Sequence, residues 1–104
     1  MIQRAGDGRE RDPLVREVLF PLGQVVMTPG VRDGIPPSEM LQALRRHARG
    51  DWGDLDPEDK QSNDRALKNG ARILSAYHSK AGVKFWVISE WDRSVTTILL
   101  PEEY

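Results

Sequence analysis

Four side chains in the last third of the chain are suited to acid–base chemistry on a phosphodiester. They belong to His78, Glu90, Arg93 and Thr97. A histidine and a glutamate can transfer protons to and from reacting groups, and a basic side chain can stabilise the charge that develops on phosphate. Gathered on one face of a sheet, these residues would make a metal-independent ribonuclease site.

The same stretch of sequence predicts the sheet that would position them. Residues Arg72–Ser79, Val83–Trp91 and Ser94–Leu100 are rich in β-branched and aromatic side chains, which favour strands. Short loops join the three segments, at Ser79–Gly82 and at Asp92-Arg93. We therefore expect an antiparallel meander.

The length of each hairpin loop decides which side chains share a face of this meander. A first loop of even length places His78 opposite Val83, and a two-residue second loop places Val87 opposite Ile98. A three-residue loop, or a bulge at Gly82, would exchange the two faces of the first strand. With the even loop, the predicted core face carries Leu74, Ala76, His78, Val83, Phe85, Val87, Ser89, Thr96, Ile98 and Leu100.

The opposite face mixes large apolar and polar groups, and it is the predicted binding surface. Its main members are Tyr77, Lys84, Trp86, Ile88 and Leu99. Aromatic and aliphatic area beside a cation suits a partner protein or a second copy of the chain. The alternative is that residues 14–20, whose apolar members follow a helical spacing, cover this face within one chain.

The predicted register argues against the ribonuclease site. It turns His78 toward the core face, whereas Glu90 and Thr97 point to the other face. A single histidine at the end of an apolar strand is commonly a hydrogen-bonded structural residue. The comparison with small sheet ribonucleases of the barnase and RelE type is an analogy of fold alone.

The preceding part of the chain predicts one strand and two helices. Leu22–Thr28 reads as a strand that ends at Pro29, and residues 31–37 read as a loop. A helix follows, begun by the prolines at 36 and 37 or capped by Ser38, and ended by Gly50; a second helix runs from Asp56 to Gly70. The expected order is β-α-α-β-β-β, an α+β domain with two helices on one face of a three- to four-stranded antiparallel sheet. The apolar stripe expected on the first helix is Leu41, Leu44 and Ala48, with Met40 and His47 on its shoulder.

Charged clusters on these helices have structural explanations. Arg45, Arg46 and Arg49 are candidate anion contacts, but cations at a helix C-terminus are favoured by the helix dipole. The acidic residues from Asp51 to Asp59 fail as a calcium loop, because position six has no glycine and position twelve is Ser62. We expect no metal and no cofactor.

Length and composition limit the range of functions. The 104 residues suit one domain, expected over residues 13–104 behind a disordered tail of residues 1–12. The formal net charge of −1 argues against strong non-specific nucleic-acid binding. No apolar run could cross a bilayer, no secretory signal is recognisable, and the chain has no cysteine, so a cytoplasmic protein is expected.

Several segments carry a resemblance to a known family. They are Pro21–Val26, Arg49–Leu55, Leu74–His78 and Asp92–Tyr104. Together they resemble a small bacterial family labelled "plasmid-related protein", some members of which bear a restriction-subunit label. The resemblance covers roughly residues 20 to 104. It implies an intracellular bacterial accessory protein associated with mobile elements, and it carries no assigned activity and no functional residues.

Overall fold

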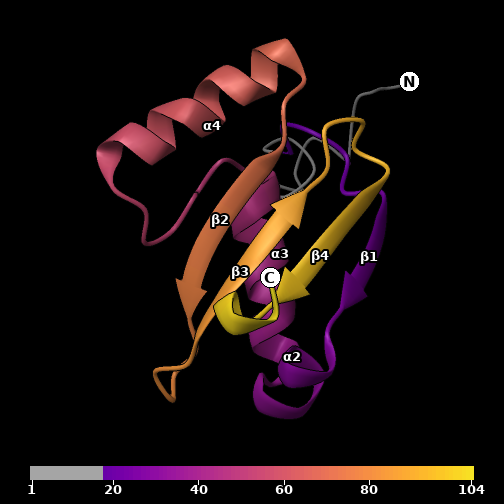
Figure 1. Cartoon of the computed structure of the whole chain (residues 1–104), viewed down its shortest axis with the longest axis vertical. Coiled ribbons are helices and arrows are strands. Elements are labelled where there is room, and N and C mark those ends of the chain that lie inside the picture. The colour runs from indigo at the N-terminus through magenta and orange to yellow at the C-terminus, as the bar shows by residue number, and fades with distance from the viewer. Residues whose placement is uncertain (1–17) are drawn as a thin grey trace, which may run out of the picture.

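The computed structural model describes residues 18–104, and these form a four-stranded sheet with helices around it (Figure 1). The α+β class and the rough order of elements are confirmed. The expected tail of residues 1–12 and the start of the segment at residues 14–20 lie outside the described residues. The elements are β1 (Gln24–Met27), α2 (Pro29–Gly34), α3 (Pro37–Ala48), α4 (Pro57–Asn69), β2 (Ile73–His78), β3 (Lys84–Ser89), β4 (Val95–Leu99) and the 3-10 turn η2 (Pro101–Glu103).

The sheet is mixed, which corrects the fully antiparallel expectation. Its strand order is β1-β4-β3-β2, and β1 pairs with β4 in parallel. The helical connection behind the sheet carries the chain back, so that β1 and β2 run in the same direction. Two hairpins then return β4 to that direction. A strand placed beside β4 by this path must be parallel to it.

The first hairpin has a three-residue loop, so the expected register of β2 is wrong. The N–H of Ser79 donates to the carbonyl of Val83 at 2.9 Å, and Gly82 takes a φ of 86°. This geometry places His78 opposite Lys84. The faces of β2 are therefore exchanged: Ile73, Ser75 and Tyr77 face α3, whereas Leu74, Ala76 and His78 face the other side. The second hairpin has the expected register, with Val87 opposite Ile98.

Helix α3 covers one face of the sheet, but it is turned differently from the expectation. Its buried residues include Met40, Ala43 and His47. The expected core stripe lies to one side of them, and Leu41 is 49% exposed. Each residue turns the helix by about 100°, so a shift of one position turns Leu41 toward solvent and leaves Leu44 half-buried, whereas Ala48 is buried as expected.

Helix α4 lies along the free edge of β2, and its Ala66 packs with Ile73, which faces the α3 side of the sheet. The side-chain amide of Asn63 donates to the carbonyl of Leu74 at 2.8 Å and accepts from its N–H at 3.3 Å. Trp52 is buried and is tied to the middle of this helix, because its indole N–H donates to Asp64 at 3.0 Å. The side chain of Asn63 thereby binds backbone groups at the edge of β2, where no neighbouring strand of the sheet pairs with them.

A short helix, α2, occupies most of the segment expected as a loop at residues 31–37. Thr28 is its N-cap, and Pro29 stands at its first position, where a missing N–H is harmless. The carboxylate of Glu103 accepts from the Thr28 hydroxyl and from the N–H of Gly30. The C-terminal turn η2 is thus tied to the segment that follows β1.

Gly53 meets a close approach of two backbones. It bridges Ala76 on the edge of β2 and takes a φ of 77°. A Cβ at this position would lie 1.9 Å from the carbonyl oxygen of Ala76, whereas a Cβ at Gly70, with a φ of 74°, would meet nothing within 4 Å.

We predict that Gly53→Ala lowers the free energy of unfolding by about 3 kcal/mol or more, since strain and clash both act. Gly70→Ala is the matched control, with strain only and an expected loss of about 1 kcal/mol. Urea unfolding followed by circular dichroism measures both values. Equal losses in the two variants would contradict the close approach at Gly53.

Candidate functional site

A chain of hydrogen-bonded side chains runs through the core beneath α3. The imidazole of His47 is fully buried, with Nδ1 2.6 Å from Ser75 Oγ and Nε2 2.9 Å from Ser89 Oγ. Ser89 Oγ lies 2.6 Å from Thr96 Oγ1, which donates to the carbonyl of Leu22 at 2.7 Å. One side chain of α3 is therefore linked to β2, β3 and β4.

The last acceptor fixes the direction of the bonds from Leu22 back to His47. A carbonyl oxygen can only accept, so Thr96 donates to Leu22 and must accept from Ser89. Ser89 then accepts from Nε2–H of His47. Because burial keeps the imidazole neutral, Nδ1 carries no proton and accepts from the hydroxyl of Ser75.

Burial and the nearby Arg93 guanidinium lower the pKa of His47 to about 3. Phe20 and Trp52 pack against its ring, with centroids 5.3 and 5.9 Å away. A group that is neutral, enclosed and fully hydrogen-bonded has no route to a substrate. We assign His47 and its hydroxyl partners to the packing of α3 against the sheet.

The predicted binding surface is not a single exposed surface. Tyr77 lies on the α3 side and is buried, and Ile88 and Leu99 are also buried. Lys84 is exposed and Trp86 is half-buried on the expected face. Three of the five predicted residues are therefore withdrawn from solvent.

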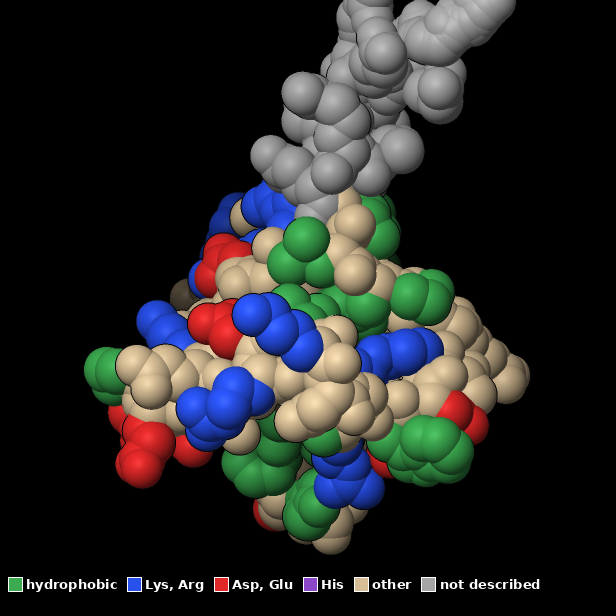
Figure 2. Space-filling model, turned by 90° about the horizontal axis from the view of Figure 1, so that it is seen from above, with side chains coloured by type: hydrophobic (Ala, Val, Ile, Leu, Met, Phe, Trp, Pro, Cys, Tyr) green, Lys and Arg blue, Asp and Glu red, His purple; other side chains and the backbone are tan. Residues whose placement is uncertain are grey.

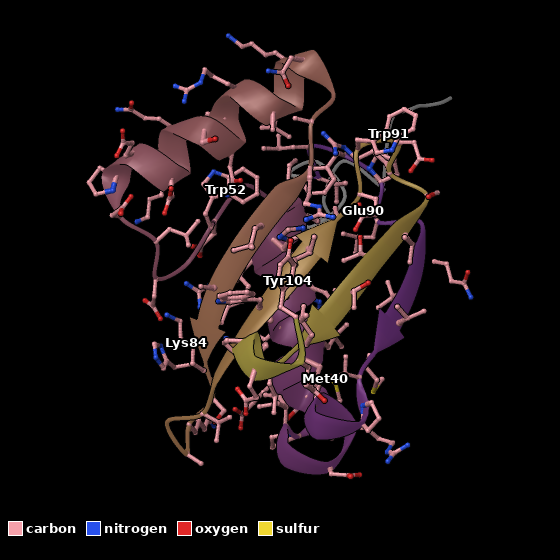
Figure 3. All side chains as sticks on the ribbon, in the orientation of Figure 1. Met40, Trp52, Lys84, Glu90, Trp91 and Tyr104 are labelled. Carbon is pink, nitrogen blue, oxygen red and sulfur yellow. The ribbon has the colours of Figure 1, made fainter. Side chains whose placement is uncertain are left out.

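The chain's own C-terminus covers much of that face. Tyr104 packs edge-on against Trp86, with ring centroids 5.8 Å apart, and its hydroxyl accepts from Arg72 at 2.7 Å. Figure 3 shows Tyr104 in front of the sheet. Residues 14–20 were the alternative cover for this face. In the described part of that segment, residues 18–20, Phe20 packs on His47 on the α3 side and does not cover Trp86.

The four candidate ribonuclease residues do not form one site. His78 pairs with Lys84, whereas Glu90 lies six residues further along β3, about 20 Å away at the rise of a strand. Lys84 and Glu90 lie at opposite ends of the strand in Figure 3. Arg93 is occupied by the carbonyls of Ala66, Ala71 and Glu90. Thr97, on the outer face, is paired with Ile88.

A small hollow of about 60 Å³ lies beside His78, lined in part by Glu39 and Arg46. Asp54 holds Nδ1 of His78 at 2.6 Å, and Asp51 holds the Arg46 guanidinium at 2.8 and 3.2 Å. Asp51 raises the pKa of Arg46, mainly through this hydrogen bond. Glu39 is the one carboxylate that lines the hollow, beside the cations Arg46 and Lys80. Because Arg46 is already bound by Asp51, it is a structural cation.

The other two candidate anion contacts do not converge with Arg46 on one site. Arg45 lines an apolar groove of about 260 Å³, and Arg49 lines a separate open hollow with Leu19, Gly50 and Asp51. Figure 2 shows basic and acidic side chains interspersed on the end of the molecule that it views, without a field of one sign. The charge distribution seen there is typical of a solvated surface.

The apolar groove is the surface that the sequence did not predict. Its lining consists of Val18, Leu22, Leu41, Leu44, Arg45 and Ala48. Val25 and Met27 of β1 point to the same side of the sheet, since they pair with Thr96 and Ile98. We call Leu22, Val25, Met27, Leu41 and Leu44 the β1–α3 surface. The sequence signal for this surface is the apolar stripe Leu41, Leu44 and Ala48, which the helical spacing predicts to face the core.

Residues 18–104 contain no candidate metal site and no membrane-spanning helix. No three His, Asp or Glu side chains converge there as a metal site requires. None of the helices in that part of the chain is long and apolar enough to cross a membrane.

No family model matches the chain, and no curated protein or solved structure matches it either. Its function is therefore inferred from the surface itself.

We predict that acid destabilises the protein through His47. Its pKa is about 3 when folded and about 6.5 when unfolded, so the unfolded state binds more protons between these values and stability falls as the pH drops. The expected loss from pH 7 to pH 4.5 is about 3 kcal/mol. Urea unfolding at both pH values measures it.

The control for this prediction is His47→Gln, which lacks the titrating group. The variant is less stable at pH 7, because hydroxyls in the network lose partners, but its stability should change little between pH 7 and pH 4.5. The carboxylates with lowered pKa, such as Asp92, contribute mainly at lower pH. A wild type with a flat profile in this window would contradict the neutral, buried His47.

Proposed function

We propose that this chain is a protein-interaction module that binds a partner through the β1–α3 surface. The observation that carries the proposal is Leu41, a large apolar side chain that is 49% exposed at an almost wholly apolar groove. Grooves of this kind bind the apolar face of an amphipathic helix. The neighbouring Leu44 is only partly buried and continues the stripe.

Charge at the groove indicates the chemistry of the partner. Arg45 is exposed and is the one charged side chain among the groove-lining residues that the structure describes. A partner helix with leucine-like anchors and an acidic residue beside them would match both features. The expected partner is therefore an acidic amphipathic helix.

The cellular role that we propose is that of an accessory protein in a bacterium, in association with a mobile element. The resemblance of residues 20–104 to the plasmid-related family supports this role. A chain of 104 residues without cysteine is also suited to a reducing cytoplasm. The ribonuclease alternative has less support, because His78 of β2 lies opposite the first residue of β3, whereas Glu90 follows the last.

We predict that Leu41→Asp reduces partner binding by at least about tenfold, since it places a charge at the centre of the apolar contact. The fold should remain, because the position is half-exposed and the loss of helix propensity is only about 0.5 kcal/mol. Affinity capture from a bacterial host with wild type and variant as bait, quantified by mass spectrometry, measures the effect.

The matched control is Trp91→Asp, which removes an apolar side chain that is 67% exposed at the β3–β4 turn. A protein retained by wild type and by the control but lost with Leu41→Asp is the expected partner. Equal retention by all three baits would show that the groove is not the binding site.

A further inference from the structure

Among residues 18–104, strand β1 forms an open edge of the sheet, and it is apolar on both faces. Val25, Val26 and Met27 are 40%, 37% and 46% exposed. Sheet edges of soluble proteins are commonly protected by lysine, by an inward-pointing charge or by a covering segment. Here β1 contains no charged residue, since its sequence is Gln-Val-Val-Met. The edge is therefore suited to pairing with another strand.

Alternate residues of β1 are already bound to β4. The N–H of Gln24 donates to Ser94 at 3.0 Å, and the N–H of Thr28 donates to Ile98 at 3.0 Å. In a parallel ladder the residues between such donors point their backbone groups the other way. Val25 and Met27 thus direct both N–H and C=O to the open side.

Both ends of this edge are closed to further pairing. Gly23 takes a φ of 66° and has no room for a Cβ, which would lie 2.4 Å from the carbonyl oxygens of Arg93 and Ser94. Pro29 begins α2 and has no N–H to donate. Only the backbone groups of Val25 and Met27 remain available.

We propose that two copies of this chain pair through β1 as antiparallel strands. The available groups allow one self-complementary register, with Val25 of one copy opposite Met27 of the other and Val26 opposite its own copy at the two-fold axis. Each Val25–Met27 pair exchanges two hydrogen bonds, and the two sheets become one continuous eight-stranded sheet. Registers centred on Val25 or Met27 would require pairing at Gly23 or Pro29.

The small contact sets the strength of this dimer. One edge of four residues buries less than the roughly 1,200 Å² typical of stable interfaces, so the association is weak and depends on concentration. Antiparallel pairing keeps Val25 and Met27 on the α3 side in both copies. The dimer therefore presents two apolar grooves on one side of a single sheet. This inference does not rest on the proposed function, since the dimer uses the outward backbone groups of Val25 and Met27, whereas no residue of β1 lines the groove itself.

Cysteine trapping tests the register directly, because the chain has no cysteine of its own. In Val26→Cys the two sulfurs meet across a pair whose Cα atoms are about 4.5 Å apart, which suits a disulfide. In Val25→Cys the same atoms are about 8 to 9 Å apart, too far for a disulfide. The two sites have similar exposure, so Val25→Cys is the matched control.

The expected result is that Val26→Cys forms a disulfide-linked dimer under mild oxidation, that Val25→Cys does not, and that a mixture of Val25→Cys with Met27→Cys does. Non-reducing gel electrophoresis reads all three. Dimer formation by Val26→Cys no greater than by Val25→Cys would overturn the proposal.

A proline variant tests the hydrogen bonds of the edge. Val25→Pro removes an outward N–H and leaves the ladder to β4 intact, so it should weaken the dimer at least about tenfold in sedimentation experiments. Leu41→Asp should weaken partner capture and leave self-association unchanged, which separates the failure of this inference from the failure of the proposed function. A wild type that stays monomeric at millimolar concentration would overturn the dimer.

Discussion

The hydrogen-bonded chain from His47 to Leu22 is the constraint on which the arrangement of the molecule depends. It joins α3 to β2, β3 and β4 and ends on the segment that leads into β1. Each hydroxyl is buried, so breaking one link leaves a polar group without a partner in an apolar surrounding. Side-chain packing alone would let α3 rotate on the sheet, whereas these bonds fix one orientation.

That orientation explains the exposed groove. With His47 turned toward the serines, Met40 and Ala43 are carried into the core beside it, and Leu41 is left beside the entrance to β1. The apolar stripe of α3 is wider than the part of the helix that packs on the sheet. Because the buried His47 needs hydrogen-bond partners in the core, α3 takes an orientation that leaves an apolar surface on the outside.

The opposite face of the sheet is partly covered by the chain itself. Tyr104 packs against Trp86, and Glu103 holds the Thr28 hydroxyl and the N–H of Gly30 at the start of α2. The Thr28 hydroxyl and the N–H of Leu100 both donate to Glu103 and lower the pKa of its carboxyl, so it is ionised at neutral pH. Among the described residues, the groove on the α3 side and the edge of β1 lie outside these contacts.

The sequence by itself determined the strands, the ends of α3 and α4 and the α+β class, because strand-forming residues, caps and glycines act within a few neighbours. It did not determine the register of β2 or the rotation of α3. A single loop residue at Gly82 exchanged the faces of Tyr77 and His78, and partners 28 and 42 residues away in sequence turned His47 inward. The candidate site was missed for the same reason: whether Leu41 faces the core or solvent depends on contacts between distant segments, which only the tertiary structure brings together.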